Sequence, residues 1–255
     1  MSNRGKGFAA RLIDDCLSVA SAQGVSLVLI SGDRGLYRRM GFMDTGLFSV
    51  IRLERDNRPP PVSYRVREWT EAGLPELEAL HRQERVRFVR APGEMAALLR
   101  TRALHCRPAR TWVVRVGERT AGYLCISDSD PQTGPGALLA REIAGSRPAI
   151  LAAASEILGA SDAECLEIET PASVAEMSFL AESVGCVRRG VGMHGTLKII
   201  DPPAFFKAIK PRLLAAGFSI RDIPSTTPEE LAALVFGSVE RESLLPLPAC
   251  GLNYI

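Results

Sequence analysis

The sequence contains few of the residues that build metal centres and disulfide frameworks. It has three histidines and six cysteines among 255 residues, and no two cysteines are spaced as Cys-x-x-Cys. Structural metal sites and disulfide-rich secreted scaffolds both depend on close, regular spacings of these residues. We therefore expect no metal site, and we expect the cysteines to be reduced, several of them within the folded interior.

An excess of one charge and a long apolar run are also lacking. Lys and Arg number 31 against 29 Asp and Glu, which gives a formal net charge of +2. No strong field therefore draws the chain to nucleic acid or to a membrane surface. The chain has no apolar segment of about 18 residues that could span a bilayer, and no signal peptide. These absences predict a cytoplasmic protein with neither nucleic acid nor membrane as a partner.

A glycine-rich turn near the N-terminus leads into an amphipathic helix. The turn is Arg4-Gly5-Lys6-Gly7-Phe8-Ala9, and its glycines leave backbone N–H groups without side chains in front of them. Apolar residues then recur at helical spacing, at Phe8, Leu12, Ile13, Cys16, Leu17 and Ala20. The N–H groups and the positive end of the helix dipole would face the same anion. The sequence thus favours either a phosphate-binding turn or a turn that binds nothing.

A strand, a short helix and a second strand follow. Val25–Ile30 is a nearly continuous apolar run, typical of a buried strand. Leu36–Met40 predicts a short helix that stops at Gly41, with Phe42 directly after it. Leu47–Leu53 predicts the second strand.

In this order, the two motifs resemble those of the GCN5-related N-acetyltransferase (GNAT) superfamily. Arg4–Ala9 is similar to its Arg/Gln-x-x-Gly-x-Gly/Ala pyrophosphate loop, and Leu36–Phe42 to its aromatic-Tyr-x-x-x-Gly-Phe motif. The resemblance implies an α/β fold with a mixed sheet, and acetyl-CoA as the co-substrate. The residues that it implies for binding the pyrophosphate are Arg4, Gly5, Lys6, Gly7, Phe8 and Ala9. It also implies that Tyr37 protonates the departing thiolate; the alternative is that Tyr37 only anchors its helix to the sheet.

The first domain, residues 1–55, corresponds to the C-terminal half of a GNAT domain. A complete GNAT domain has several strands and helices before the pyrophosphate loop, whereas only Met1, Ser2 and Asn3 precede it here. We therefore expect a strand edge and an apolar helix face that are left uncovered. Either the chain is a truncated form of a longer protein, or its start codon was assigned too late, or another chain completes the sheet, as in a homo-oligomer.

A second domain, residues 62–200, follows a charged and proline-rich linker. The sequence predicts strands at 63–67, 111–116, 121–126, 138–143, 165–169 and 195–200, and helices at 71–87, 92–104, 148–158 and 174–183. This order resembles a complete GNAT domain. The counterpart of its pyrophosphate loop, at 144–148, has one glycine, Gly145, and loses a donor at Pro148. We therefore expect a degenerate domain that binds no coenzyme A.

Residues 201–255 are expected to form a small C-terminal unit with a docking tail. Helices are predicted over Pro202–Ala216 and from Thr227 onward, where a cap and a proline begin the helix. The tail at 245–255 is apolar and rich in proline, so we expect it to dock. The whole arrangement resembles the tandem acetyltransferases of the enhanced-intracellular-survival type. In these the terminal carboxylate can act as a base, which implies that role for Ile255; the alternative is a tail that fills a groove for stability.

The resemblance as a whole implies an acetyl-CoA-dependent N-acyltransferase. The acetyl group would pass to an amine-bearing small molecule or peptide by direct attack in a ternary complex, because no Cys or Ser nucleophile lies in a recognisable motif. The alternative function is a non-catalytic interaction or regulatory protein built on a GNAT scaffold.

Overall fold

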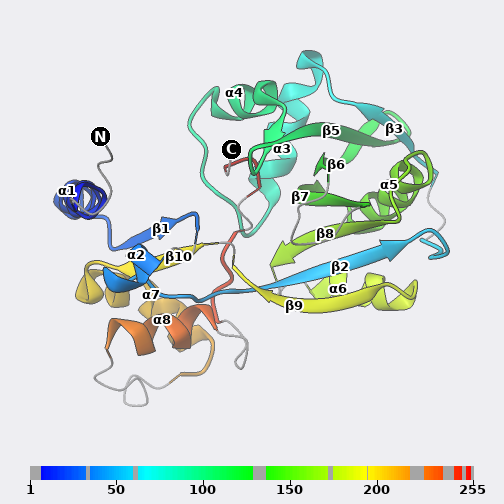
Figure 1. Cartoon of the computed structure of the whole chain (residues 1–255). Helices are drawn as coiled ribbons and strands as arrows, with labels where there is room; N and C mark the ends of the chain where they lie inside the picture. The colour runs from blue at the N-terminus through cyan, green and yellow to red at the C-terminus, as the bar shows by residue number, and fades with distance from the viewer. Residues whose placement is uncertain are drawn as a thin grey trace. The chain divides into compact units, whose positions relative to one another are not determined.

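The fold is described from a computed structural model, which covers residues 7–32, 35–59, 63–128, 136–171, 175–193, 195–218, 227–237, 244–248 and 251–253. The chain divides into two compact units (Figure 1). Unit 1 comprises residues 1–47 and 192–245, and unit 2 comprises residues 48–191 and 246–255. Each unit is therefore built from two separate stretches of the chain.

Unit 2 contains a mixed sheet with the strand order β3-β5-β6-β7-β8-β2-β9. Its strands are β2 (Leu47–Glu54), β3 (Arg65–Glu68), β4 (Ala103–Leu104, paired with β5), β5 (Arg107–Val116), β6 (Arg119–Ser127), β7 (Ala137–Gly145), β8 (Cys165–Pro171) and β9 (Val187–Gly192). Strands β7 and β8 are parallel, and helix α5 (Arg147–Gly159) connects them. The connection is a helical crossover, as parallel strands require. The mixed α/β fold predicted from the sequence is confirmed.

Helices cover both faces of this sheet. Neighbouring residues of a strand point to opposite faces. Val114 and Leu124 belong to the apolar cluster with α5 and α6 (Ala175–Ser183), whereas Val113 and Tyr123 belong to the cluster with α3 (Leu74–Gln83) and α4 (Glu94–Thr101). Helix α5 has nine buried residues. It is therefore the central helix of the larger cluster.

Unit 1 is built around a two-stranded sheet. Its elements are α1 (Phe8–Ala22), β1 (Leu27–Ile30), α2 (Gly35–Arg39), β10 (Thr196–Ile199), α7 (Pro202–Ala215) and α8 (Pro228–Phe236). Strands β1 and β10 pair antiparallel. The rings of Phe205 in α7 and Phe236 in α8 lie 5.8 Å apart. The predicted start of α8 is confirmed, because Thr227 and Glu230 form a capping box.

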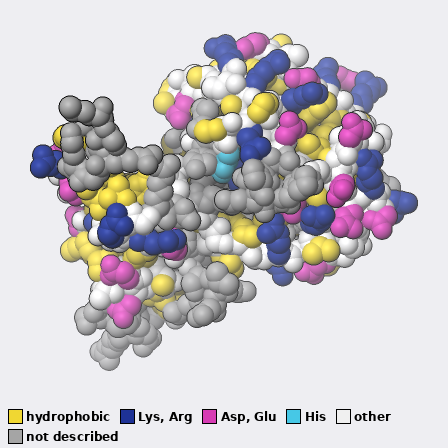
Figure 2. All heavy atoms as spheres, in the orientation of Figure 1, with side chains coloured by type: hydrophobic (Ala, Val, Ile, Leu, Met, Phe, Trp, Pro, Cys, Tyr) yellow, Lys and Arg dark blue, Asp and Glu magenta, His cyan; other side chains and the backbone are white. Residues whose placement is uncertain are grey.

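Helix α1 leaves an apolar face exposed. None of its residues is buried, and Phe8, Leu12 and Val19 are each more than half exposed. Figure 2 shows hydrophobic side chains at the surface in the region of α1 and β1. An uncovered helix face was expected from the sequence.

Each unit combines two segments that are distant in the sequence. The predicted domains 1–55, 62–200 and 201–255 are instead three continuous segments. Strand β2, expected in the first domain, pairs with β8 in unit 2, with Ile51 opposite Ile168. Strand β10, expected to end the second domain, pairs with β1 in unit 1, with Leu27 opposite Ile199. An apolar pattern marks a strand and its inner face, but it does not identify the partner strand.

Strand β9 was not predicted from the sequence. Val187–Gly192 contains two arginines and two glycines and is mostly exposed. It lacks the alternation of apolar residues on which strand prediction depends. The short strand β4 was missed as well, whereas the other expected strands and helices are present with shifted ends.

Candidate cofactor-binding site

The described part of the predicted phosphate-binding turn is Gly7, Phe8 and Ala9. Gly7 is the N-cap residue of α1 and has a left-handed backbone, with φ 73° and ψ 5°, which glycine adopts without strain. A Cβ at Gly7 would meet no atom within 4 Å. The Gly7 carbonyl accepts the N–H of Arg11 at 3.1 Å, so the helix begins directly at the turn. Arg4, Gly5 and Lys6 lie outside the described residues.

At the N-terminus of α1, the described residues provide no side-chain cap for the backbone donors. The N–H groups of a first helical turn have no acceptor within the helix. Among the described residues no side chain caps this terminus, and its first turn contains no acidic residue. Open N–H groups at the positive end of a helix dipole favour an anion. In the described part of the chain no side chain occupies these donors, and the phosphate interpretation stays a prediction.

Helix α2 ends in a Schellman motif that includes Tyr37. Gly41 has φ 79° and donates its N–H to the carbonyl of Arg38 at 3.0 Å. Phe42 donates its N–H to the carbonyl of Tyr37 at 3.0 Å, and the two rings lie 6.1 Å apart. This ring contact is the hydrophobic contact that accompanies such a cap. The Tyr-x-x-x-Gly-Phe spacing is therefore one local structure, and buried Phe42 supports the ring of Tyr37.

Strand β10 also fixes the end of α2. Lys198 donates from Nζ to the carbonyl of Met40 at 2.5 Å, and Nζ lies 5.8 Å from the centroid of the Phe42 ring. Met43 exchanges two backbone hydrogen bonds with Leu197, at 2.8 and 3.0 Å. Sequence reasoning missed Lys198, because nothing near Tyr37 in the sequence indicates which distant strand lies beside it.

The Tyr37 side chain is half-buried. Its ring packs on Phe42, which fits the anchoring interpretation. Its hydroxyl forms no hydrogen bond with any residue in the described part of the chain. A proton donor must be able to reach its acceptor, so the hydroxyl also fits the role of general acid.

Gly41→Ala is expected to lower the free energy of unfolding by about 1–2 kcal/mol, because a Cβ disfavours the left-handed backbone. Thermal or urea unfolding measures this change. Gly159→Ala is the matched control, since Gly159 ends α5 without a positive φ and has open space around it. The control is expected to be neutral or slightly stabilising. An equal loss in both variants would contradict the assigned cap.

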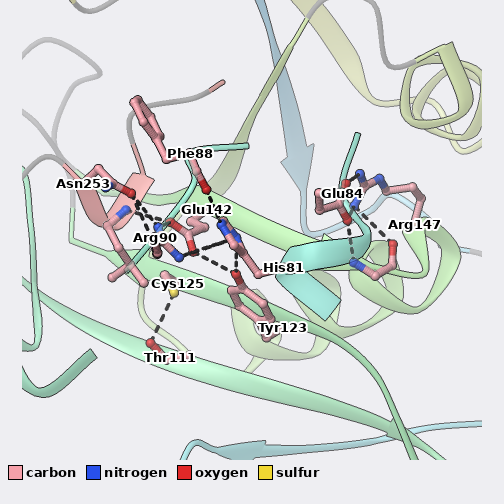
Figure 3. A network of polar contacts seen from close by, with 12 residues as sticks. His81, Glu84, Phe88, Arg90, Thr111, Tyr123, Cys125, Glu142, Arg147 and Asn253 are labelled. Carbon is pink, nitrogen blue, oxygen red and sulfur yellow. Dashed lines mark hydrogen bonds and ion pairs between the residues drawn. The ribbon is translucent and has the colours of Figure 1, made fainter. Parts of the chain in front are cut away.

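In unit 2, the turn that corresponds to the pyrophosphate loop binds a carboxylate of the same unit (Figure 3). The N–H of Gly145 donates to Glu84 Oε1 at 2.8 Å, and the N–H of Ser146 donates to the carbonyl of Ala121 at 2.8 Å. Arg147 donates to both oxygens of Glu84, at 3.1 and 2.6 Å. A Cβ at Gly145 would overlap the Ala121 carbonyl oxygen. Glu84 therefore occupies the anion position at the start of α5, which supports the expectation of a degenerate second domain.

A buried polar cluster lies elsewhere in unit 2 (Figure 3). Glu142 accepts hydrogen bonds from Arg90 at 2.9 and 2.6 Å, from the Tyr123 hydroxyl at 2.8 Å and from the Leu252 N–H at 2.8 Å. Burial acts to raise the pKa of Glu142, but the hydrogen bond and charge of Arg90 outweigh it, and the pKa is lowered. Burial lowers the pKa of neighbouring His81. An ionised carboxylate with four donors around it is a structural anchor and a poor base.

Sequence reasoning missed this cluster. Its signal was the pair of charged residues Arg141 and Glu142 inside an apolar strand run, because buried charges in proteins are paired. The docking expected for the C-terminal tail is seen at the short helix η3 (Gly251–Asn253), in which Gly251 and Leu252 are buried. Ile255, the predicted base, lies outside the described residues.

In the described parts of the chain, no helix has both the length and the apolar character needed to cross a bilayer. Within the same parts, no three or more His, Cys, Asp or Glu side chains are grouped so that they could hold a metal ion.

No protein-family model and no curated protein matches the sequence. Solved structures do share its fold. A GCN5-related N-acetyltransferase from Anabaena variabilis aligns with a TM-score of 0.58 and 20% identity, covering 80% of this chain and 54% of that one. One from Kribbella flavida gives 0.51 and 16%, covering 79% and 50%. Eis1 from Mycobacterium abscessus gives 0.51 and 18%, covering 81% and 55%.

The chain spans about half the length of these structures. The likeness extends over about four fifths of the chain and so includes most of the described elements. The chain therefore shares its fold with these GCN5-related N-acetyltransferases and with Eis1.

Proposed function

We propose that the chain is an acetyl-CoA-dependent N-acyltransferase whose cofactor site lies in unit 1. The observation that carries this proposal is the uncapped N-terminus of α1 behind the left-handed Gly7. Such a terminus suits a pyrophosphate, because its N–H groups and dipole both favour negative charge. The proposed binding residues are Arg4, Gly5, Lys6, Gly7, Phe8 and Ala9. Two of the solved structures with this fold are N-acetyltransferases, which supports acyl transfer to an amine as the reaction class.

The contrast between the two units supports a single cofactor site per chain. At α1 the donors have no partner in the described residues. At α5, Gly145 and Arg147 already bind Glu84, and the Ser146 N–H binds a backbone carbonyl. A phosphate at α5 would have to displace a carboxylate held by an arginine. We therefore expect one molecule of coenzyme A per chain.

In the proposed reaction an amine of a small molecule or peptide attacks the thioester carbonyl carbon directly. The carbon–sulfur bond breaks, and the hydroxyl of Tyr37 gives its proton to the departing thiolate. The proton that the attacking nitrogen loses as the amide forms restores the tyrosine hydroxyl. Before the attack the acceptor ammonium must lose a proton, and the proposed base is the terminal carboxylate of Ile255. The packing of Tyr37 on Phe42 supports its part in this scheme, because a general acid needs a fixed position.

Calorimetric titration of the full chain with coenzyme A tests the site, with a stoichiometry near one expected. Gly7→Asp is expected to weaken binding about tenfold or more, because the new carboxylate competes for the same donors. Asp is a good N-cap and tolerates a left-handed backbone, so the helix should remain stable.

Gly93→Asp is the matched control for Gly7→Asp. Gly93 is the N-cap of α4 in unit 2, with φ 79°, ψ −11° and open space at its Cβ, and its replacement should leave the affinity unchanged. Release of coenzyme A thiol with a panel of primary amines then tests turnover. Absence of binding would refute the proposed site, and binding without turnover would favour the non-catalytic alternative.

A further inference from the structure

A pocket of about 550 Å³ lies in unit 2, on the face of the sheet that α5 covers. Every residue that lines it belongs to unit 2, so one unit alone forms the pocket. The elements that meet there are β3, β5, β6, β7 and α5 (Figure 1). Its apolar floor consists of residues that belong to the larger apolar cluster or pack against it, namely Val66, Trp112, Ile126, Leu138 and Ile157.

The pocket lies where the cover of the sheet ends. Helix α5 ends at Gly159. The edge strand β3 pairs with β5 only at residues 112–115, whereas β5 already begins at Arg107. The first part of β5 therefore extends beyond β3, and it lines the pocket there. A hollow of this volume with an apolar floor and a few polar groups is typical of small-molecule sites.

Four charged side chains line the pocket, and two of them already have a neighbour. Arg102 Nη1 lies 3.9 Å from Glu68 Oε1, and Glu156 lies beside a tyrosine hydroxyl. Arg110 and Asp128 have no ion-pair or hydrogen-bond partner among the residues that the structure describes. These two are the opposite charges that a ligand can bind.

Arg110 and Asp128 are diagonal neighbours on one face of the sheet. Arg110 lies opposite Ile126 in the pairing of β5 with β6. Asp128 is two residues beyond Ile126 and therefore belongs to the same face. Such a diagonal position separates the Cα atoms by about 7–8 Å. The two charges do not pair with each other, but a ligand that carries both a carboxylate and an ammonium can bridge them.

We propose that this pocket binds a free α-amino acid with an aromatic side chain. The carboxylate of the amino acid binds the guanidinium of Arg110, which suits a carboxylate because it offers two parallel donors. The ammonium binds Asp128. The aromatic ring covers the apolar floor, where it packs against the half-buried ring of Trp112. A smaller side chain would remove less of this floor from water.

Calorimetric titration of the full chain with L-phenylalanine, in the absence of acetyl-CoA, tests the recognition of both charges. The analogue 3-phenylpropanoate lacks the ammonium, and 2-phenylethylamine lacks the carboxylate. Each is expected to bind about tenfold more weakly than L-phenylalanine, because a charge-assisted hydrogen bond is lost. Equal affinity for L-phenylalanine and either analogue would overturn the proposal. So would the absence of L-phenylalanine binding at millimolar concentration.

Arg110→Gln and Asp128→Asn locate the site. Arg110→Gln should weaken the binding of L-phenylalanine and 3-phenylpropanoate about tenfold and leave 2-phenylethylamine unaffected. Asp128→Asn should instead weaken L-phenylalanine and 2-phenylethylamine and leave 3-phenylpropanoate unaffected. Both side chains are exposed, so the fold should tolerate each change. Arg67→Gln is the matched control, because Arg67 is exposed on β3 but adjoins Val66 and so lies on the opposite face.

The result does not depend on the proposed function, because the titration requires neither acetyl-CoA nor turnover. L-phenylalanine is itself an amine and could also bind as an acceptor. Binding that is as strong in both variants as in the unmodified chain would therefore place the ligand elsewhere and overturn the proposal. A chain without acetyltransferase activity that shows the expected pattern would refute the proposed function and support the pocket.

Discussion

Tyr37→Phe is expected to lower the turnover of acetyl-CoA about 100-fold or more, the usual contribution of a general acid. The substitution removes only the hydroxyl, which has no hydrogen-bond partner among the described residues. The ring contact with Phe42 is retained. The free energy of unfolding and the affinity for coenzyme A should therefore be nearly unchanged. Steady-state release of coenzyme A thiol measures the effect.

Tyr64→Phe is the control for Tyr37→Phe. The Tyr64 hydroxyl donates to the carbonyl of Ala152 at 2.8 Å within unit 2, so the same atom is removed from a residue that has no part in the proposed chemistry. We expect a loss of about 1 kcal/mol in the free energy of unfolding and unchanged turnover. Equal turnover in Tyr37→Phe and in the unmodified chain would instead assign Tyr37 the role of an anchor.

Arg90→Ala is expected to lower the free energy of unfolding by about 3–5 kcal/mol, because it leaves Glu142 ionised and buried without its main partner. Both tryptophans, Trp69 and Trp112, lie in unit 2. Their fluorescence during urea unfolding therefore reports on the unit that contains the substitution. The change in the transition midpoint at neutral pH gives the loss.

Arg100→Ala provides the comparison for Arg90→Ala. Arg100 donates to both oxygens of Glu71 at 2.7 and 2.9 Å, and its side chain and that of Glu71 are 62% and 57% exposed. Solvent screens such an exposed ion pair, so the loss of stability should be small. Equal destabilisation of Arg90→Ala and Arg100→Ala would contradict the assignment of the Arg90→Ala loss to burial of the ion pair.

The loss in Arg90→Ala should depend on pH in a defined direction. Burial acts to raise the pKa of Glu142, but Arg90, the Leu252 N–H and Tyr123 together lower it below 4.5. A carboxylate with a lowered folded pKa contributes stability that is fully present above the unfolded value and is lost as the pH falls through the folded value. The difference between Arg90→Ala and the unmodified chain should therefore shrink in acid below about pH 4.5.

Local features of the fold could be predicted from the sequence. The cap at Thr227 and the end of α2 at Gly41 each depend on residues within one helical turn, so a short stretch of sequence contains all the information. The strands β5 and β6 and the loop between them were recognisable for the same reason, since alternation and a glycine loop mark them.

Features that depend on distant residues could not be predicted. Nothing around Gly145 indicates that Glu84, from the end of α3, binds its N–H. Pro148 indicated that the turn lacks a donor for phosphate. It did not indicate that a carboxylate occupies the turn. Likewise, Lys198 reaches α2 only because β10 pairs with β1. In each case the sequence provides the donor and the acceptor, and only the packing of distant elements brings them together.

Strand β2 pairs in unit 2 and strand β10 pairs in unit 1. These pairings determine which sheet can be completed first during synthesis. Strand β1 leaves the ribosome early, but its partner β10 is made only after every strand of the large sheet. Unit 1 therefore cannot complete its two-stranded sheet until β10 is synthesised. Strand β2 belongs to the sheet of unit 2, whose other strands are synthesised before β10. Throughout this interval β1 lacks its partner β10, and long-range strand pairing is slow while aggregation competes. A chain that stops before Thr196 is therefore expected to aggregate more readily than one that includes β10.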